Sequence, residues 1–250
     1  MDYLQPYFQP IFSADEHEVI GYEILARYVN GSSVESLGPF FQDNSIPEEY
    51  RIEVDNHILE IALAKIKSMN DDLLIFINRD PNLLMLDHGE NFLEIVKKYF
   101  AEEQLSRIVI ELSETKFDGD TDSLHHLLTY YKTYGIKIAI DHLGADSHLD
   151  RISTLSPQIL RVNIDQLRYQ GWDSHKDVIS SIGVLARKIG ATLLFENIET
   201  VYQLQFAWKY GGRYYQGGYL AEPAPTFIEK DQLKEQFKQE CHRFIISEKR

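Results

Sequence analysis

Residues 192–217, TLLFENIETVYQLQFAWKYGGRYYQG, contain one complete strand–helix–strand unit. The short apolar run Thr192–Glu196 is typical of a buried strand. The helical spacing of Thr200–Tyr210 is followed by Gly211, a common helix terminator, and a second apolar run lies at Tyr214–Gly217. Two strands joined by a helix through short loops are expected to lie parallel in one sheet.

The same alternation of strand and helix runs through the whole chain. Further strands are predicted at Tyr7–Phe12, Val19–Glu23, Leu73–Asn78, Ile108–Leu112, Ile136–Asp141 and Leu160–Ile164. Further helices are predicted at Glu48–Lys67, Phe92–Phe100, Ser123–Tyr134 and Lys176–Ile189. About eight strands in 250 residues indicate fold class α/β and favour a TIM-like (β/α)8 barrel over an open doubly wound sheet or two small domains.

The last part of the chain has a different composition. Residues 227–250 are rich in Lys, Glu and Gln, with apolar positions at Leu233, Phe237, Phe244 and Ile245. We therefore expect a barrel domain over residues 1–226 and a helix over 227–250. That helix either packs on the barrel or connects it to a further domain.

Composition narrows the classes of partner. The 39 acidic residues exceed the 25 basic ones, for a formal net charge of −14, so the chain is unsuited to holding long nucleic acid by its phosphates. Neither a membrane-spanning run of ~18 apolar residues nor a secretory signal is visible. The single cysteine, Cys241, excludes an internal disulfide and is consistent with a reducing cytoplasm.

Nearly every predicted strand finishes on a polar residue. These residues are Glu23, Asn78, Glu111, Asp141, Asn163, Glu196 and Gln216. In a β/α barrel the parallel strands all end at one mouth, so these side chains are expected to converge there. Any one of them, such as Asp141, is equally well explained as a helix cap or a turn residue. The recurrence along the chain favours a shared site.

A cluster of carboxylates is electrostatically unfavourable unless a cation relieves the repulsion. Carboxylate and amide oxygens suit hard divalent ions. The sequence therefore predicts a site for a divalent metal, Mg²⁺ or Mn²⁺, with Ca²⁺ as an alternative.

The order of these motifs resembles that of EAL-domain proteins. The signature triplet stands here as Glu23-Ile24-Leu25, within Gly21–Arg27. Gln9-Pro10-Ile11 precedes it, and the later family motifs are matched by Phe76–Asn78, Glu111–Glu114, Asp141–Gly144, Leu160–Asn163, Glu196–Glu199 and Gln216–Tyr219. Each motif is weak alone, but eight in family order over about Tyr7 to Pro225 make a specific pattern.

The resemblance implies a metal-dependent phosphodiesterase fold that opens cyclic di-GMP to the linear dinucleotide pGpG. It implies a first metal held by Glu23, Asn78, Glu111 and Asp141, with Asp141 bridging to a second. Glu196 would assist the second metal or act as general base. Arg27 would pair with a phosphate, unless it forms an ordinary ion pair. The implied nucleotide contacts are Gln9, Leu25, Asn163, Glu199 and Gln216; for Gln9 and Leu25 a packing role is an equal alternative.

Several positions depart from the family pattern. His142 replaces a second aspartate, and it either binds a different metal or is a loop residue that binds none. Arg161 replaces a lysine, and arginine effectively cannot release a proton near a catalytic water, although it can anchor a phosphate. Asn163 replaces an aspartate, Gly218 replaces a tyrosine, and the loop Ala145–Leu149 is about one residue short.

These departures leave three functions open. The chain is a cyclic di-GMP phosphodiesterase weakened by His142, Arg161 and the short loop, a receptor that binds the nucleotide without significant hydrolysis, or a scaffold that does neither. The retained ligands for the first metal, together with Glu196, argue against the scaffold. By analogy with the family, the barrel is expected to form a homodimer.

Overall fold

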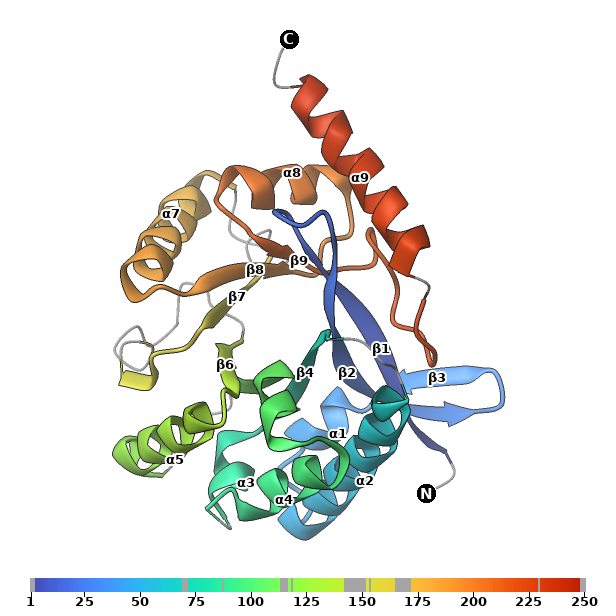
Figure 1. Ribbon diagram of the computed structural model, residues 1–250, viewed down its shortest axis with the longest axis vertical. Helices are drawn as coiled ribbons and strands as arrows, with labels where there is room; N and C mark the ends of the chain where they lie inside the picture. Colours follow the sequence, from blue (N-terminus) through green and yellow to red (C-terminus); the bar gives the residue numbers. More distant parts are fainter. Residues whose placement is uncertain are drawn as a thin grey trace.

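A closed barrel of eight strands forms the centre of the molecule (Figure 1). The computed structural model describes residues 3–68, 72–86, 88–112, 117, 119–141, 152, 154–164, 172–228 and 230–247. Around the ring the strands are β1 (Leu4–Ser13), β9 (Tyr214–Tyr215), β8 (Thr192–Glu196), β7 (Ile159–Asn163), β6 (Lys137–Ile140), β5 (Ile108–Leu112), β4 (Leu74–Arg79) and β2 (Glu18–Asn30). Pairing between β1 and β2 closes the ring, which confirms the predicted TIM-like barrel.

The expectation of a wholly parallel sheet was wrong for β1, which runs antiparallel to both of its neighbours, β2 and β9. The physical reason is the length of the connection. Only residues 14–17 separate β1 from β2, whereas a parallel crossover needs a dozen or more residues. The remaining barrel strands, from β2 through β4 to β9, pair in parallel.

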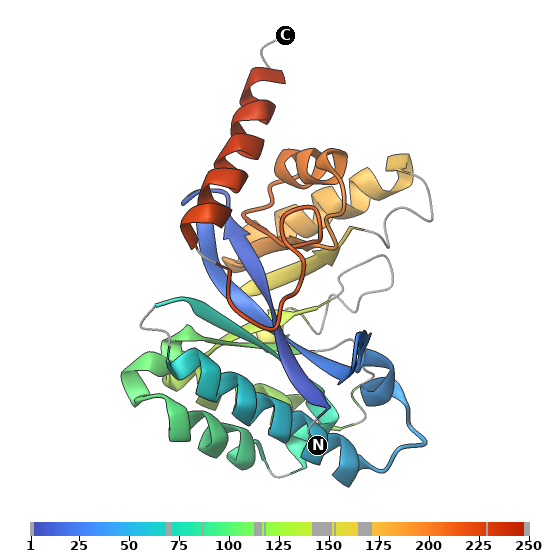
Figure 2. The same cartoon turned by 90° about the vertical axis from the view of Figure 1, so that its right-hand side faces the viewer.

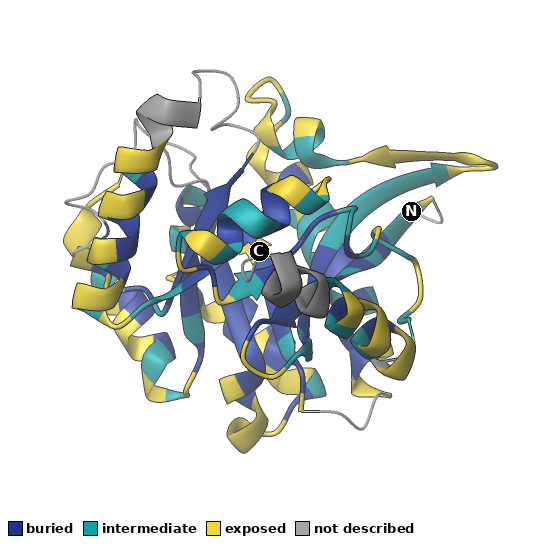
Figure 3. Cartoon of the chain, turned by 90° about the horizontal axis from the view of Figure 1, so that it is seen from above, coloured by how far each residue is buried: buried dark blue, intermediate teal, exposed yellow. Residues whose placement is uncertain are grey.

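Strand β2 is longer than predicted and leaves the barrel. Its pairing with β4 stops at Ile24, but it continues to Asn30 and turns back as β3 (Ser33–Ser36). All four residues of β3 are exposed and they form no apolar run, so the sequence did not predict this hairpin. Figure 3 shows the hairpin as an exposed extension beside the buried strands.

The helices largely follow the predicted segments. Helix α2 is Glu48–Lys67, as predicted, and α4 (Glu90–Tyr99), α5 (Thr121–Thr133), α7 (Trp172–Ile189) and α8 (Val201–Lys209) lie close to their predicted ranges. The predicted stop at Gly211 adopts a φ of +86°, and two further glycines that follow helices, Gly135 and Gly190, adopt φ values of +79° and +73°. Short elements were missed: α1 (Gly38–Gln42), α3 (Pro81–Met85) and the 3₁₀ helix Glu102–Arg107. Within the described part of the chain, no helix is long and apolar enough to span a bilayer.

The barrel strands pack on both faces. Their outward residues join the helices in one large apolar cluster. Their inward residues form a separate layer that fills the barrel, made by Ile11, Phe76, Val109, Ala139, Ile159 and Leu194. This inner layer is the floor on which the polar strand ends stand.

Helix α9 (Lys230–Ser247) covers the side of the barrel where the β1–β2 hairpin supplies no helix (Figures 1 and 2). Leu233 and Phe237 are buried there, and the Phe237 ring lies 5.0 Å from that of Phe12 and 6.2 Å from that of Tyr215. Lys234 Nζ donates to Glu18 Oε2 at 2.6 Å. This packing supports the interpretation of a final barrel helix, while the boundary at 226/227 stays a prediction.

Truncation of Phe237 tests whether α9 belongs to the barrel fold. Phe237→Ala removes a ring that is only 1% exposed, so the free energy of unfolding should fall by about 3–5 kcal/mol in a urea titration. Tyr202→Ala, at a 76% exposed site, should change it by no more than ~0.5 kcal/mol. Equal effects of the two substitutions would show that α9 adds nothing to the stability of the barrel.

Candidate functional site

The inward face of the barrel strands positions the polar cluster. Side chains two residues apart on a strand point to the same face. Asn78, Glu111 and Glu196 therefore stand directly above the floor residues Phe76, Val109 and Leu194. Asp141 and Arg161 stand in the same way above Ala139 and Ile159. The predicted convergence of strand ends at one mouth is thus observed.

Arg161 lies at the centre of the cluster. It is 2% exposed, and its guanidinium contacts four carboxylates that come from different parts of the barrel. Nη2 lies 3.1 Å from Glu23 Oε2, and Nε lies 3.3 Å from Asp141 Oδ1 and donates to Glu196 Oε2 at 3.1 Å. Nη1 forms an ion pair with Glu111.

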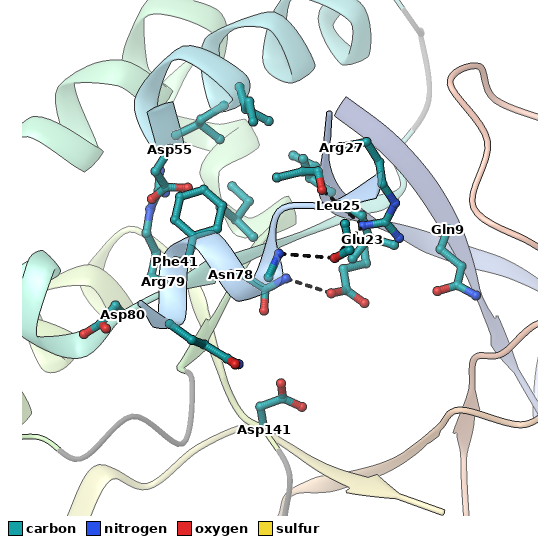
Figure 4. Close-up of a pocket in the computed structure, with 18 of the residues that line it drawn as sticks. Gln9, Glu23, Leu25, Arg27, Phe41, Asp55, Asn78, Arg79, Asp80 and Asp141 are labelled. Carbon is teal, nitrogen blue, oxygen red and sulfur yellow. Dashed lines mark hydrogen bonds and ion pairs between the residues drawn. The ribbon is translucent and has the colours of Figure 1, made fainter. Parts of the chain in front are cut away.

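Two amides complete the packing around Glu23. Asn78 Nδ2 donates to Glu23 Oε1 at 2.7 Å, and Gln216 Nε2 donates to Glu23 Oε2 at 2.7 Å. The Gln216 carbonyl oxygen accepts a bond from Arg161 at 3.0 Å. Figure 4 shows Glu23, Asn78 and Asp141 directed into one opening.

The electrostatics of the cluster favour charged groups. Burial raises the pKa of Glu23, but the Arg161 guanidinium and the hydrogen bonds from Asn78 and Gln216 outweigh burial and hold it below its usual value. Burial lowers the pKa of Arg161, but Glu23 and Glu196 raise it above its usual value. Four carboxyl side chains surround one guanidinium, so acidic groups outnumber the basic group at the mouth.

The donor set fits a hard divalent cation. The Glu111 carboxylate is fully buried, and its Oε2 accepts no hydrogen bond from any residue that the structure describes. The Arg161 guanidinium lies among these carboxylates. Within the described residues, no group of three or more acidic, histidine or cysteine side chains is arranged to hold a metal ion. The chemistry therefore suits a metal whose binding would rearrange the contacts around Arg161.

A cavity of about 590 Å³ opens above the cluster. Of the residues predicted from sequence, its walls include Gln9, Glu23, Leu25, Arg27, Asn78, Asp141, Arg161, Glu196 and Gln216. Gln9 lies opposite Glu23 on β1, accepts a bond from Gln216 at 3.3 Å and donates to Ala221 O at 3.1 Å. The Arg27 guanidinium is half-buried and donates to Ala26 O at 3.1 Å and to Ser36 Oγ at 3.4 Å.

The other predicted residues lie outside the cavity walls. Glu111 is sealed beneath the cluster, and Asn163 is a buried residue that pairs in register with Glu196 on the next strand. Glu199 accepts a bond from the Gly218 N–H at 3.1 Å. His142, the loop 145–149 and Glu114 lie outside the described residues.

One lobe of the cavity was missed in the sequence. It lies between α1, α2 and the end of β4, and Phe41, Asp55, Arg79 and Asp80 line it (Figure 4). Arg79 forms an ion pair with Asp55 and lies 4.9 Å from the centre of the Phe92 ring. The dipeptide Asp80-Pro81 was the available signal, since Asp80 caps α3 through a bond from Asn82 N.

Gly217 holds Gln216 in place. Its φ is +154°, and an added Cβ would lie 2.2 Å from the Ile198 backbone N and O. Ile198 N donates to Gln216 O at 3.1 Å, so the two segments approach as closely as glycine permits.

Gly217→Ala should therefore lower the free energy of unfolding by about 2–3 kcal/mol, because the backbone of one segment must move. Gly183→Ala is the matched control. It lies in α7 with its nearest neighbour 3.7 Å from the added Cβ, and it should stabilise the protein by about 0.5–1 kcal/mol through helix propensity. Urea unfolding measures both, and a neutral Gly217→Ala would contradict the close approach.

The fold and the site together define a class of protein: a TIM-like barrel with a cluster of buried carboxylates around one arginine at the carboxyl ends of its strands. The chain belongs to the EAL domain family, whose model matches residues 2–223. It is 53% identical over 253 residues to the uncharacterised EAL-domain protein YkuI of Bacillus subtilis, covering 100% of this chain and 62% of YkuI.

Solved structures agree with this assignment. A crystal structure of YkuI in complex with cyclic di-GMP and calcium superposes with a TM-score of 0.92 and covers 99% of this chain and 62% of that one. A manganese and cyclic di-GMP complex of Klebsiella pneumoniae BlrP1, 22% identical, shares the fold with a TM-score of 0.73 over 89% of this chain and 56% of BlrP1. The probable cyclic di-GMP phosphodiesterase PdeD of Escherichia coli is 23% identical over 87% of this chain and 41% of PdeD. The chain thus spans less than two thirds of these relatives.

Proposed function

We propose that this chain binds cyclic di-GMP together with a divalent metal at the mouth of the barrel. The main supporting observation is the arrangement of four buried carboxylates around a single guanidinium beneath a cavity of about 590 Å³. The YkuI complex, at 53% identity, supports the choice of ligand and of a divalent ion.

The proposed metal ligands are Glu23, Asn78, Glu111 and Asp141, whose oxygens suit Mg²⁺, Mn²⁺ or Ca²⁺. A bound metal would supply Lewis acidity at the scissile phosphate and lower the pKa of a water. Glu196 is proposed to accept a proton from that water, and Arg27 to pair with a phosphate. Gln9, Leu25, Asn163, Glu199 and Gln216 are the proposed nucleotide contacts.

The barrel is either a slow phosphodiesterase or a receptor without significant hydrolysis. One observation favours weakened chemistry: Arg161 donates to Glu196, the proposed base, and the always-charged guanidinium cannot take a proton from it. The contact with the guanidinium must therefore be given up before this oxygen of Glu196 can accept a proton from water.

The remaining proposals concern the whole protein. By family analogy we propose a homodimer. Residues 227–250 are proposed to be a final helix that packs on the barrel, with a connector to a further domain as the alternative. The single cysteine is consistent with a reducing compartment.

Titration of cyclic di-GMP with Mg²⁺, Mn²⁺ and Ca²⁺ in turn, with pGpG followed by chromatography, tests the function. Glu23→Gln should weaken metal-dependent binding by about 10- to 100-fold, because it removes a charged ligand. Glu35→Gln, on the exposed β3 hairpin, should leave binding unchanged. Binding without product under Mg²⁺ and Mn²⁺ would establish a receptor, and no binding under any metal would reject both functions.

His142→Asp tests whether a second metal position limits hydrolysis. Restoring the carboxylate of the family pattern should raise the rate of pGpG formation in Mg²⁺, since two-metal chemistry needs a cation at both the attacking and the leaving oxygen. His126→Asp, on the exposed face of α5, is the matched control. An unchanged rate would assign the deficit to Arg161 or to the loop 145–149.

A further inference from the structure

The Arg161 guanidinium touches the same oxygen atoms that a metal would need. Glu23, Glu111 and Asp141 are three of the four proposed metal ligands, and each forms an ion pair with Arg161. All three carboxylates are at least nine-tenths buried, so water contributes little to the compensation of their charge. Arg161 already supplies the positive charge that compensates them.

Two cations cannot both use these oxygens at full strength. A divalent ion near the guanidinium meets a like charge in a low-dielectric site, where repulsion is strong. It must also break contacts that Arg161 makes with Glu111 and Asp141. Two parts of the guanidinium's surroundings are not carboxylates: Gln216 Oε1, 3.0 Å from Nη2, and the cavity that Arg161 lines.

We propose that Arg161 is a built-in counter-ion that competes with the divalent metal for the buried carboxylates and so sets the metal affinity of the site. The inference rests on the proposed metal-dependent function and deepens it. In the metal-free barrel Arg161 then compensates part of the buried negative charge, and the metal binds at the expense of the Arg161 ion pairs.

The shape of the side chain explains why arginine serves this purpose. The planar guanidinium presents five donors in a fixed fork, and here three different nitrogens reach four carboxylates. A lysine has a single nitrogen and cannot span the same set. Arginine also keeps its charge, whereas a buried lysine can lose a proton and yield to a metal.

The test measures Mn²⁺ affinity by calorimetry on chelator-stripped protein without nucleotide. Arg161→Gln should bind Mn²⁺ at least about tenfold more tightly than wild type, because a like charge is removed. Arg161→Lys should fall between the two. Arg213→Gln, which removes an exposed arginine paired with exposed Asp15, should bind like wild type.

Thermal unfolding separates competition from a merely structural role. Metal-free Arg161→Gln should unfold at a lower temperature than wild type, and Mn²⁺ should raise its midpoint by more than it raises that of wild type. A structural role alone would lower the midpoint without tightening metal binding. If Arg161→Gln does not fold without metal, the affinity of Arg161→Lys decides.

The outcomes distinguish the two proposals. Mn²⁺ affinity in folded Arg161 variants equal to or weaker than in wild type would overturn the competition and leave the metal site standing. Absence of Mn²⁺ binding in wild type and in every variant would overturn the metal site itself. Cyclic di-GMP binding, measured separately, would then decide what remains of the proposed function.

Discussion

The buried negative charge at the mouth of this barrel must be compensated if the barrel is to close. Glu23, Glu111, Asp141 and Glu196 lose most of their contact with water when the barrel closes, and each would be costly to bury as an isolated ion. The Arg161 guanidinium offsets that cost by contacting all four. Removing one partner from a buried ion pair typically costs about 3–5 kcal/mol, so this arrangement matters for folding as well as for chemistry.

The barrel brings these groups together through the alternation of its strands. Five polar residues at the mouth lie two positions after an apolar residue of the inner layer, as Glu111 does after Val109; they are Asn78, Glu111, Asp141, Arg161 and Glu196. Strand β1 runs in the opposite direction, and there the order is reversed: Gln9 precedes Ile11. The antiparallel strand β1 thus presents a polar side chain, Gln9, at the same mouth as the parallel strands.

The sequence predicted the features that depend on local periodicity. Barrel strands such as Ile108–Leu112, the helix Glu48–Lys67 and the gathering of polar strand ends all follow from residue spacing. The direction of β1 is set by the short connection to β2, which leaves no room for a crossover helix. The strand–helix pattern in the rest of the chain suggested a parallel strand here as well. The lobe around Asp55 and Arg79 was missed because its residues meet only through packing of α1 and α2 against β4.

The central contacts of Arg161 were also beyond the reach of sequence patterns. They join residues separated by 20 to 138 positions, and no spacing predicts which carboxylates a single guanidinium will reach. From its motif alone the residue was interpreted as a phosphate anchor or as a loss of proton-transfer capacity. Its contacts add a different role, that of a charge partner for the whole cluster.

The departures from the family pattern then act in one direction. In the family pattern that this sequence resembles, aspartates stand at the positions of His142 and Asn163, so this chain has two fewer acidic residues in these motifs. The same pattern has a lysine at the position of Arg161, so a cation that can lose its proton is replaced by one that effectively cannot. Fewer anions and a permanent cation both reduce the electrostatic demand for metal ions. Because a weaker demand for metal affects two-metal chemistry before it affects nucleotide binding, these substitutions support the proposed receptor over the proposed enzyme.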